Sequence, residues 1–143
     1  RGGEHMAVSG YYLSVSSDRI EVAGGIYHPA PETMLVVRTH IATNYQELRR
    51  ILANKGLRQR MGALQGDELT RAPKGFDPGH PAIDLIKKKD WLLDTTLDPS
   101  LATTPQLRRE IADRFRAMTP FIDFLNRPLL VPRPAEKLRD YFS

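Results

Sequence analysis

The chain has 143 residues, of which 41% are hydrophobic and 27% are charged, which fits one globular domain and excludes an intrinsically disordered chain. A formal net charge of +4 and a pI near 9.6 favour anionic partners such as phosphates, nucleic acid or acidic proteins. The absence of cysteine excludes disulfides and thiolate metal sites and fits a cytoplasmic protein, and the apolar runs are too short to cross a bilayer.

Residues 10 to 27 are predicted to form a β-hairpin. The apolar side chains follow a two-residue period on both sides of Ser16-Ser17-Asp18, and these three residues are typical of a turn. Gly24-Gly25 interrupts the second strand, as a β-bulge or the close approach of another backbone would. Pro31 fits the first turn of the helix that follows.

Three helices are predicted in the middle of the chain. The first covers residues 31 to 40, and a second begins at Thr43, which has capping-box spacing to Gln46. Gly56 stands where a helix would stop. The third begins at Pro81 and ends at Lys87, Lys88 and Lys89. Positive side chains are favourable at the C-terminal end of a helix, where the helix dipole is negative.

A strand and a long helix are predicted to follow. Residues 91 to 97 are rich in large and β-branched side chains, as strands are. Thr103 or Thr104 caps the helix, and Pro105 lies in its first turn. Pro120 is expected to kink it. Its apolar stripe consists of Leu107, Ile111, Phe115, Met118, Ile122 and Leu125, and an extended tail is expected at Pro128, Pro132 and Pro134.

This order of elements offers too few parallel crossovers for a doubly wound sheet. It predicts a single α+β domain over residues 1 to 143, with a small antiparallel sheet and helices packed mainly on one face.

Several motifs carry a resemblance to a known family. They are Gly10-Tyr11-Tyr12-Leu13, Gly24 to Pro29, Gly66-Asp67-Glu68-Leu69, Arg71 to Phe76, and His80-Pro81. In this order and spacing the chain resembles the bacterial and fungal family called domain of unknown function 2461, from about Gly10 to Leu125. The family usually has Trp where this chain has Tyr27, and it usually carries a mostly helical portion before the first motif. The resemblance implies a mixed α+β fold without that portion, and it implies no reaction.

The segment from Gly66 to Pro81 is the first candidate site. It holds Arg71, Lys74 and His80 among glycines and prolines, which are expected to make the loop rigid. The loop would present the arginine guanidinium, which can bind an anion through two N–H groups, together with the lysine ammonium and the histidine imidazole. Tyr12 and His28 are expected to face the same ligand. The structural alternative is a simple turn, in which Arg71 and Lys74 pair with nearby carboxylates at Asp67, Glu68 or Asp77.

These residues predict a protein that binds an anionic small molecule or a protein partner through an Arg/Lys/His loop. The alternative from another class is an enzyme acting on a phosphorylated or carboxylated small molecule, with His80 or His28 as general acid or base. The four histidines show no metal-binding spacing and no nucleophile motif occurs, so no metal and no cofactor are expected and the catalytic residues stay unknown.

A basic run is the second candidate surface. If its residues share one face, they predict salt-dependent binding of nucleic acid, although recognised nucleic-acid-binding motifs and interleaved aromatics are lacking. No membrane partner is expected. The run consists of Arg49, Arg50, Lys55, Arg58 and Arg60, together with Lys87, Lys88 and Lys89.

Overall fold

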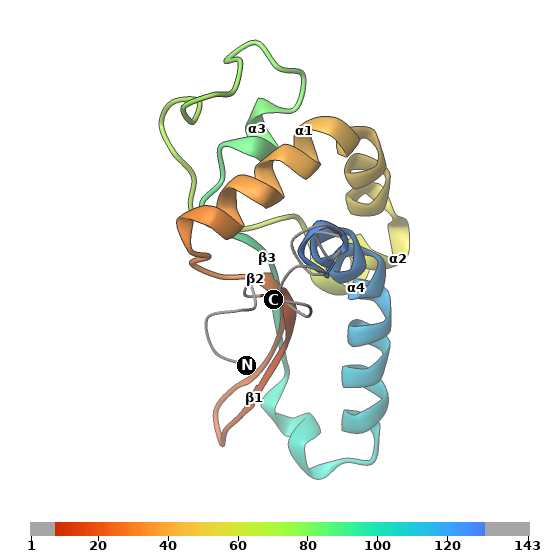
Figure 1. Cartoon of the computed structure of the whole chain (residues 1–143). Helices are drawn as coiled ribbons and strands as arrows, with labels where there is room; N and C mark the ends of the chain where they lie inside the picture. The colour runs from red at the N-terminus through yellow and green to blue at the C-terminus, as the bar shows by residue number, and fades with distance from the viewer. Residues whose placement is uncertain (1–7, 131–143) are drawn as a thin grey trace, which may run out of the picture.

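A computed structural model describes residues 8–130. Within these residues, three strands and five helical segments follow one another (Figure 1). In order they are β1 (Gly10–Val15), β2 (Ile20–Ile26), α1 (Pro31–Ala53), α2 (Lys55–Met61), α3 (Ile83–Ile86), β3 (Trp91–Leu97), the 3₁₀ helix η2 (Pro99–Thr103) and α4 (Gln106–Leu130). In the part of the chain that is described, no helix is both long enough and apolar enough to pass through a membrane.

The strands form one antiparallel sheet in the order β1-β2-β3. The predicted hairpin and the predicted strand at residues 91 to 97 are both confirmed. Ala23 in the central strand lies opposite Tyr12 on one side and Asp94 on the other. The fold is α+β, with the helices mainly on one face of the sheet, as predicted.

The glycine pair in β2 belongs to a close approach and not to a bulge, since the register with both neighbours runs through it without interruption. A Cβ at Gly24 would lie 2.8 Å from the Met118 sulfur of α4. Gly25 has φ +132°, and a Cβ there would overlap the backbone of Trp91 in β3. The backbone conformation at Gly25 therefore requires glycine, and Gly24 leaves room for the Met118 side chain.

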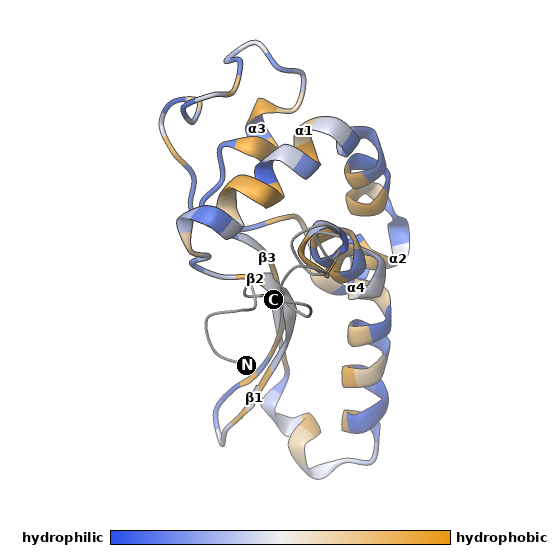
Figure 2. Ribbon diagram, viewed as in Figure 1, coloured by the Kyte–Doolittle hydropathy of each residue, from blue (hydrophilic) through white to orange (hydrophobic). Residues whose placement is uncertain are grey.

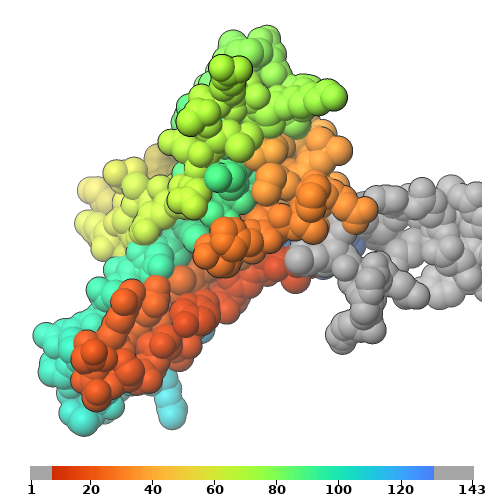
Figure 3. Space-filling view, turned by 90° about the vertical axis from the view of Figure 1, so that its left-hand side faces the viewer, coloured from red at the N-terminus to blue at the C-terminus, as the bar shows by residue number. Residues whose placement is uncertain are grey.

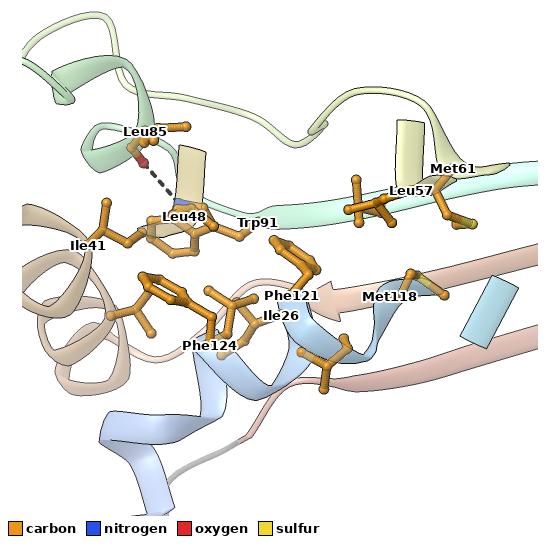
Figure 4. Close-up of a cluster of buried hydrophobic side chains, with 14 of the residues drawn as sticks. Ile26, Ile41, Leu48, Leu57, Met61, Leu85, Trp91, Met118, Phe121 and Phe124 are labelled. Atoms are coloured by element: carbon orange, nitrogen blue, oxygen red, sulfur yellow. Dashed lines mark hydrogen bonds between the residues drawn. The ribbon is translucent and has the colours of Figure 1, made fainter. Parts of the chain in front are cut away.

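The core lies between the sheet, α1, α2 and α4. Trp91, Phe121 and Phe124 are fully buried and gather beside Ile26 and other aliphatic side chains, and the Trp91 indole N–H donates to the Leu85 carbonyl at 2.9 Å (Figure 4). Hydrophobic and hydrophilic residues alternate along α1 and α4, as expected of helices with one buried face (Figure 2).

The first two predicted helices form α1 as two helical stretches joined at a kink at Asn44, one residue from the predicted start at Thr43. The predicted cap at Thr43 is wrong. The Thr43 hydroxyl donates back to the Thr39 carbonyl instead of capping a new helix. Asn44 has the non-helical angles φ −120° and ψ 29°, and its side-chain amide donates to the His40 carbonyl at 3.0 Å. Because the side chain satisfies that carbonyl, the helix bends at Asn44 without ending.

The predicted stop at Gly56 is also wrong. Asn54 separates α1 from α2, and its side chain accepts the Leu57 amide at 3.0 Å, so Gly56 lies inside α2. The third helix is shorter than expected: α3 begins two residues after Pro81 and ends before the lysines.

The apolar stripe of the last helix is confirmed, and its second half is the more deeply buried. α4 begins at Gln106, and its axis changes direction along its length, in keeping with Pro120 inside it (Figure 1). Pro128 lies within α4 and not in an extended tail. Pro132 and Pro134 lie outside the described residues.

Ser9, just before β1, is tied to α4. Its amide donates to the Asn126 side-chain oxygen at 2.7 Å, and the Asn126 amide donates back to the Ser9 carbonyl at 3.2 Å. The Ser9 hydroxyl also donates to the Ile122 carbonyl at 3.2 Å. This clasp joins residues that are 117 positions apart.

Candidate functional site

A histidine and a buried carboxylate meet where β2 ends. The His28 backbone N–H donates to Asp90 Oδ1 at 2.7 Å, and His28 Nδ1 lies 3.3 Å from the same oxygen. The His28 side chain is 62% exposed, whereas Asp90 is 2% exposed. The carboxylate favours the proton on Nδ1, which leaves Nε2 directed to solvent as a hydrogen-bonding or proton-accepting atom.

The backbone at this histidine is unusual. His28 has φ 47°, the left-handed region, where non-glycine residues are uncommon. Its ring stacks against the Tyr27 ring with centroids 3.8 Å apart. The Asp90 contact and this stacking hold an exposed imidazole in one orientation at a cost in backbone strain, which is typical of functional positions.

Asp90 also anchors the start of the predicted loop. Its second oxygen accepts the Asp67 amide at 3.4 Å. Gly66 has φ 115°, and any Cβ there would clash with Asp90. Lys88 Nζ donates to the Gly66 carbonyl at 3.1 Å. One buried carboxylate therefore fixes His28 and the beginning of the loop together.

Arg71 and Lys74 lie on the exposed part of that loop, which extends beyond α3 (Figures 1 and 3). Within residues 8–130 neither side chain makes an ion pair or a hydrogen bond, so the structural alternative of pairing with Asp67, Glu68 or Asp77 is not observed there.

His80 has a different environment from His28. Its Nδ1 accepts the Ala82 amide at 2.9 Å, and its Nε2 donates to the Ala42 carbonyl at 3.1 Å. The ring also meets Tyr45 edge-on at 5.3 Å between centroids. Both ring nitrogens are used, so His80 fastens the end of the loop to α1.

Tyr12 is on the outer face of the sheet, which α4 does not cover, and it is 54% exposed. Tyr27 follows β2 and is 66% exposed. The structure thus joins His28 to the start of the loop through Asp90, and it ties His80 to α1 instead.

Comparison with known proteins gives a family. The family model described as conserved hypothetical protein (DUF2461) matches residues 1–124. The chain belongs to this family. The match begins earlier than the expected Gly10 and ends at almost the expected residue. Neither a curated protein nor a solved structure matches the chain.

For this DUF2461 member, sequence reasoning missed Asp90, which lies 62 residues from His28 in the chain. It also missed a second acidic group on the outer face of the sheet. Glu21 pairs with Thr96 and Asp94 with Ala23, so the two carboxyls are diagonal neighbours. Partial burial and the Glu21 carboxylate raise the pKa of Asp94 to about 6. Alternation fixes the face of each residue within its own strand, and the register between β2 and β3 brings the two carboxyls to the same face.

The predicted basic run is divided. Arg49 is bound to Asp84 at 2.8 Å and to the Pro81 carbonyl, and Lys88 is turned inward to Gly66. α2 and the segment that precedes β3 lie on opposite sides of the view in Figure 1. These residues therefore do not form one continuous cationic face.

Two surface hollows lie away from His28. One, of about 430 Å³, is lined by residues of α1, α2 and α4 and by Asn54; the other, of about 760 Å³, is lined by the first half of α4 and the two residues before it. Among the described residues, no group of three or more His, Asp and Glu side chains is arranged to hold a metal ion.

Proposed function

We propose that the chain is a ligand-binding protein that takes an anionic group, phosphate or carboxylate, at the edge formed by His28 and the loop from Gly66 to Pro81. The observation that carries the proposal is the Asp90 carboxylate, which orients the His28 imidazole and anchors the loop at Asp67. Arg71 and Lys74 supply the exposed charges that an anion needs.

Binding is favoured over catalysis because the imidazole is so open to water. General acid–base catalysis gains from a site that excludes solvent and holds the reacting atoms in place, and His28 is 62% exposed. A surface imidazole and two exposed cations suit recognition of an anion. In this arrangement His80 contributes by holding the loop.

Titration with inorganic phosphate and with citrate, followed by ¹H–¹⁵N NMR of backbone, histidine and arginine N–H groups, tests the proposal. Shifts are expected at His28, Asp67 and Arg71. The Arg71→Ala/Lys74→Ala double variant is expected to weaken binding by at least about tenfold. The matched control Arg108→Ala/Arg109→Ala removes the same charge from exposed positions of α4. If both double variants lose the same affinity for the anions, the loss is explained by net charge alone and the proposed site is refuted.

An enzyme using His28 as general acid or base is the second candidate, because a buried carboxylate at Nδ1 is how many catalytic imidazoles are oriented. It predicts hydrolysis of a simple phosphate or carboxylate ester that is abolished by His28→Gln and reduced by Asp90→Asn. Lack of turnover by the wild type across such a panel leaves the binding proposal alone.

The proposed compartment is the cytoplasm, on the ground that a chain with 0 cysteines needs no oxidising environment. Fractionation of the source cells with a tagged full-length gene product tests this.

A further inference from the structure

β1 forms an open edge of the sheet. Among residues 8–130, no strand or isolated bridge pairs with its outer side. Natural edge strands are usually protected by lysine, proline, a bulge or a covering segment. β1 has the sequence Gly-Tyr-Tyr-Leu-Ser-Val, without charge or proline, and its register with β2 is continuous. The usual protections are therefore missing from the strand itself.

The same strand gathers exposed apolar surface. Eight large hydrophobic side chains are exposed in the described part of the chain, and five of them lie between Val8 and Val15. The hairpin lies at the surface along the lower part of the face in Figure 3, and on the opposite face of the sheet Tyr11 contacts Phe115 of α4. Such a concentration on one short segment marks a contact surface more than scattered exposure does. The five are Val8, Tyr11, Tyr12, Leu13 and Val15.

The backbone groups at this edge can be assigned. The Ser16 amide donates to the Arg19 carbonyl at 2.8 Å, so it points toward β2. Peptide directions alternate along an antiparallel strand. The amides and carbonyls of Tyr11, Leu13 and Val15 therefore point outward, where another strand can reach them.

We propose that β1 pairs with β1 of a second copy of this chain, antiparallel and about a two-fold axis, so that two three-stranded sheets become one of six strands. In a two-fold interface the same surface of both copies is in contact, so a charged strand would repel its copy. β1 carries no charge. A register with Leu13 on the axis places Tyr11 opposite Val15 and Tyr12 opposite Ser14, which are apolar or uncharged pairs.

A second copy of the chain is favoured over a charged peptide as the partner, because β1 has no charged side chain that could form an ion pair with such a peptide. It also places the exposed side chains of Tyr11, Leu13 and Val15 from both copies side by side on one face of the joined sheet. The helices of both copies stay on the same side of the joined sheet, since directly opposed residues of antiparallel strands share a face.

Sedimentation equilibrium of the full 143-residue chain tests the proposal, with a mass twice 16.2 kDa expected. Leu13→Pro removes an outward amide and none of the β1–β2 bonds, and Leu13→Lys adds a charge that meets its copy. Either is expected to raise the dimer dissociation constant by at least about tenfold.

The matched control is Leu35→Lys, which places the same charge at an exposed leucine of α1 and is expected to remain a dimer. Circular dichroism shows whether each variant is folded. If Leu13→Pro is unfolded, Leu13→Lys alone is used in the sedimentation test. A wild-type chain that stays monomeric up to about 1 mM overturns the proposal. So does a dimer that survives in folded Leu13→Lys, or a larger open-ended aggregate.

Discussion

The Asp94 carboxyl is expected to make stability rise as the pH falls from 8 toward 4.5. Its pKa in the folded chain is raised from 3.8 to about 6, by partial burial first and by Glu21 second. The folded chain therefore holds this proton more tightly than the unfolded chain, and ionisation of Asp94 opposes folding. The cost is complete above pH 6 and disappears as the pH approaches 3.8.

A shift of about two pKa units corresponds to about 3 kcal/mol for a fully buried group. Asp94 is only partly buried, so solvent screening reduces the expected cost to about 1 kcal/mol. Asp94→Asn removes it and is expected to stabilise the protein by about 1 kcal/mol at pH 8. Most of that gain is expected to be lost at pH 4.5.

Urea unfolding followed by tryptophan fluorescence at pH 8, 6.5, 5.5 and 4.5 measures this. The single tryptophan, Trp91, is fully buried and reports the transition. Burial first and Arg127 second lower the pKa of His40, and this makes stability fall as the pH falls below 6.5. The difference between wild type and Asp94→Asn cancels that contribution.

Glu21→Gln is expected to change stability in the same direction, because it removes the neighbouring carboxylate. Asp123→Asn, at an exposed carboxyl of α4, controls for the general loss of a negative charge. If Asp94→Asn has the same effect at every pH, or destabilises at pH 8, the raised pKa of Asp94 is refuted.

Three further substitutions test the packing. Gly25→Ala is expected to cost more than about 3 kcal/mol, since φ +132° excludes a side chain and β3 blocks its space, whereas Gly10→Ala meets nothing within 4 Å and should be tolerated; thermal melts of both decide this. Arg38→Met leaves two backbone carbonyls without donors and is expected to lower the free energy of unfolding by about 2 kcal/mol in urea titration, and an unchanged midpoint would contradict that. Gly24→Ala is expected to cost about 1–2 kcal/mol, and adding Met118→Ala should show coupling of at least about 0.5 kcal/mol in a double-mutant cycle; strict additivity would argue against the contact.

Local sequence patterns predicted the elements whose cause is local. The hairpin turn, the β-branched strand at residues 91 to 97 and the stripe along α4 depend on neighbours in the chain, and all three were correct. The predicted boundary at Thr43 lies next to the observed kink at Asn44. The cap at Thr43 and the stop at Gly56 were wrong, because a side-chain hydrogen bond decided whether the helix bent or ended. A polar side chain near a helix gives the same local signal in both cases.

The candidate site could be predicted only in part, for the same reason. His28 was named as a candidate ligand-binding residue, and its partner Asp90 was not found, because the contact spans 62 positions. His80 was predicted to face a ligand, which stays a prediction, and the sequence did not indicate that both of its ring nitrogens bind backbone groups of the protein. Residue type and spacing do not reveal which hydrogen-bonding groups already have a partner within the protein.

The clasp between Ser9 and Asn126 bears on how the protein folds during synthesis. The first strand emerges from the ribosome long before the helix that holds it, since the two bonded residues are 117 positions apart. Pairings of this separation form late and slow the folding of a domain. Until α4 arrives, the apolar hairpin remains without its cover, and in that interval it is open to chaperones or to aggregation.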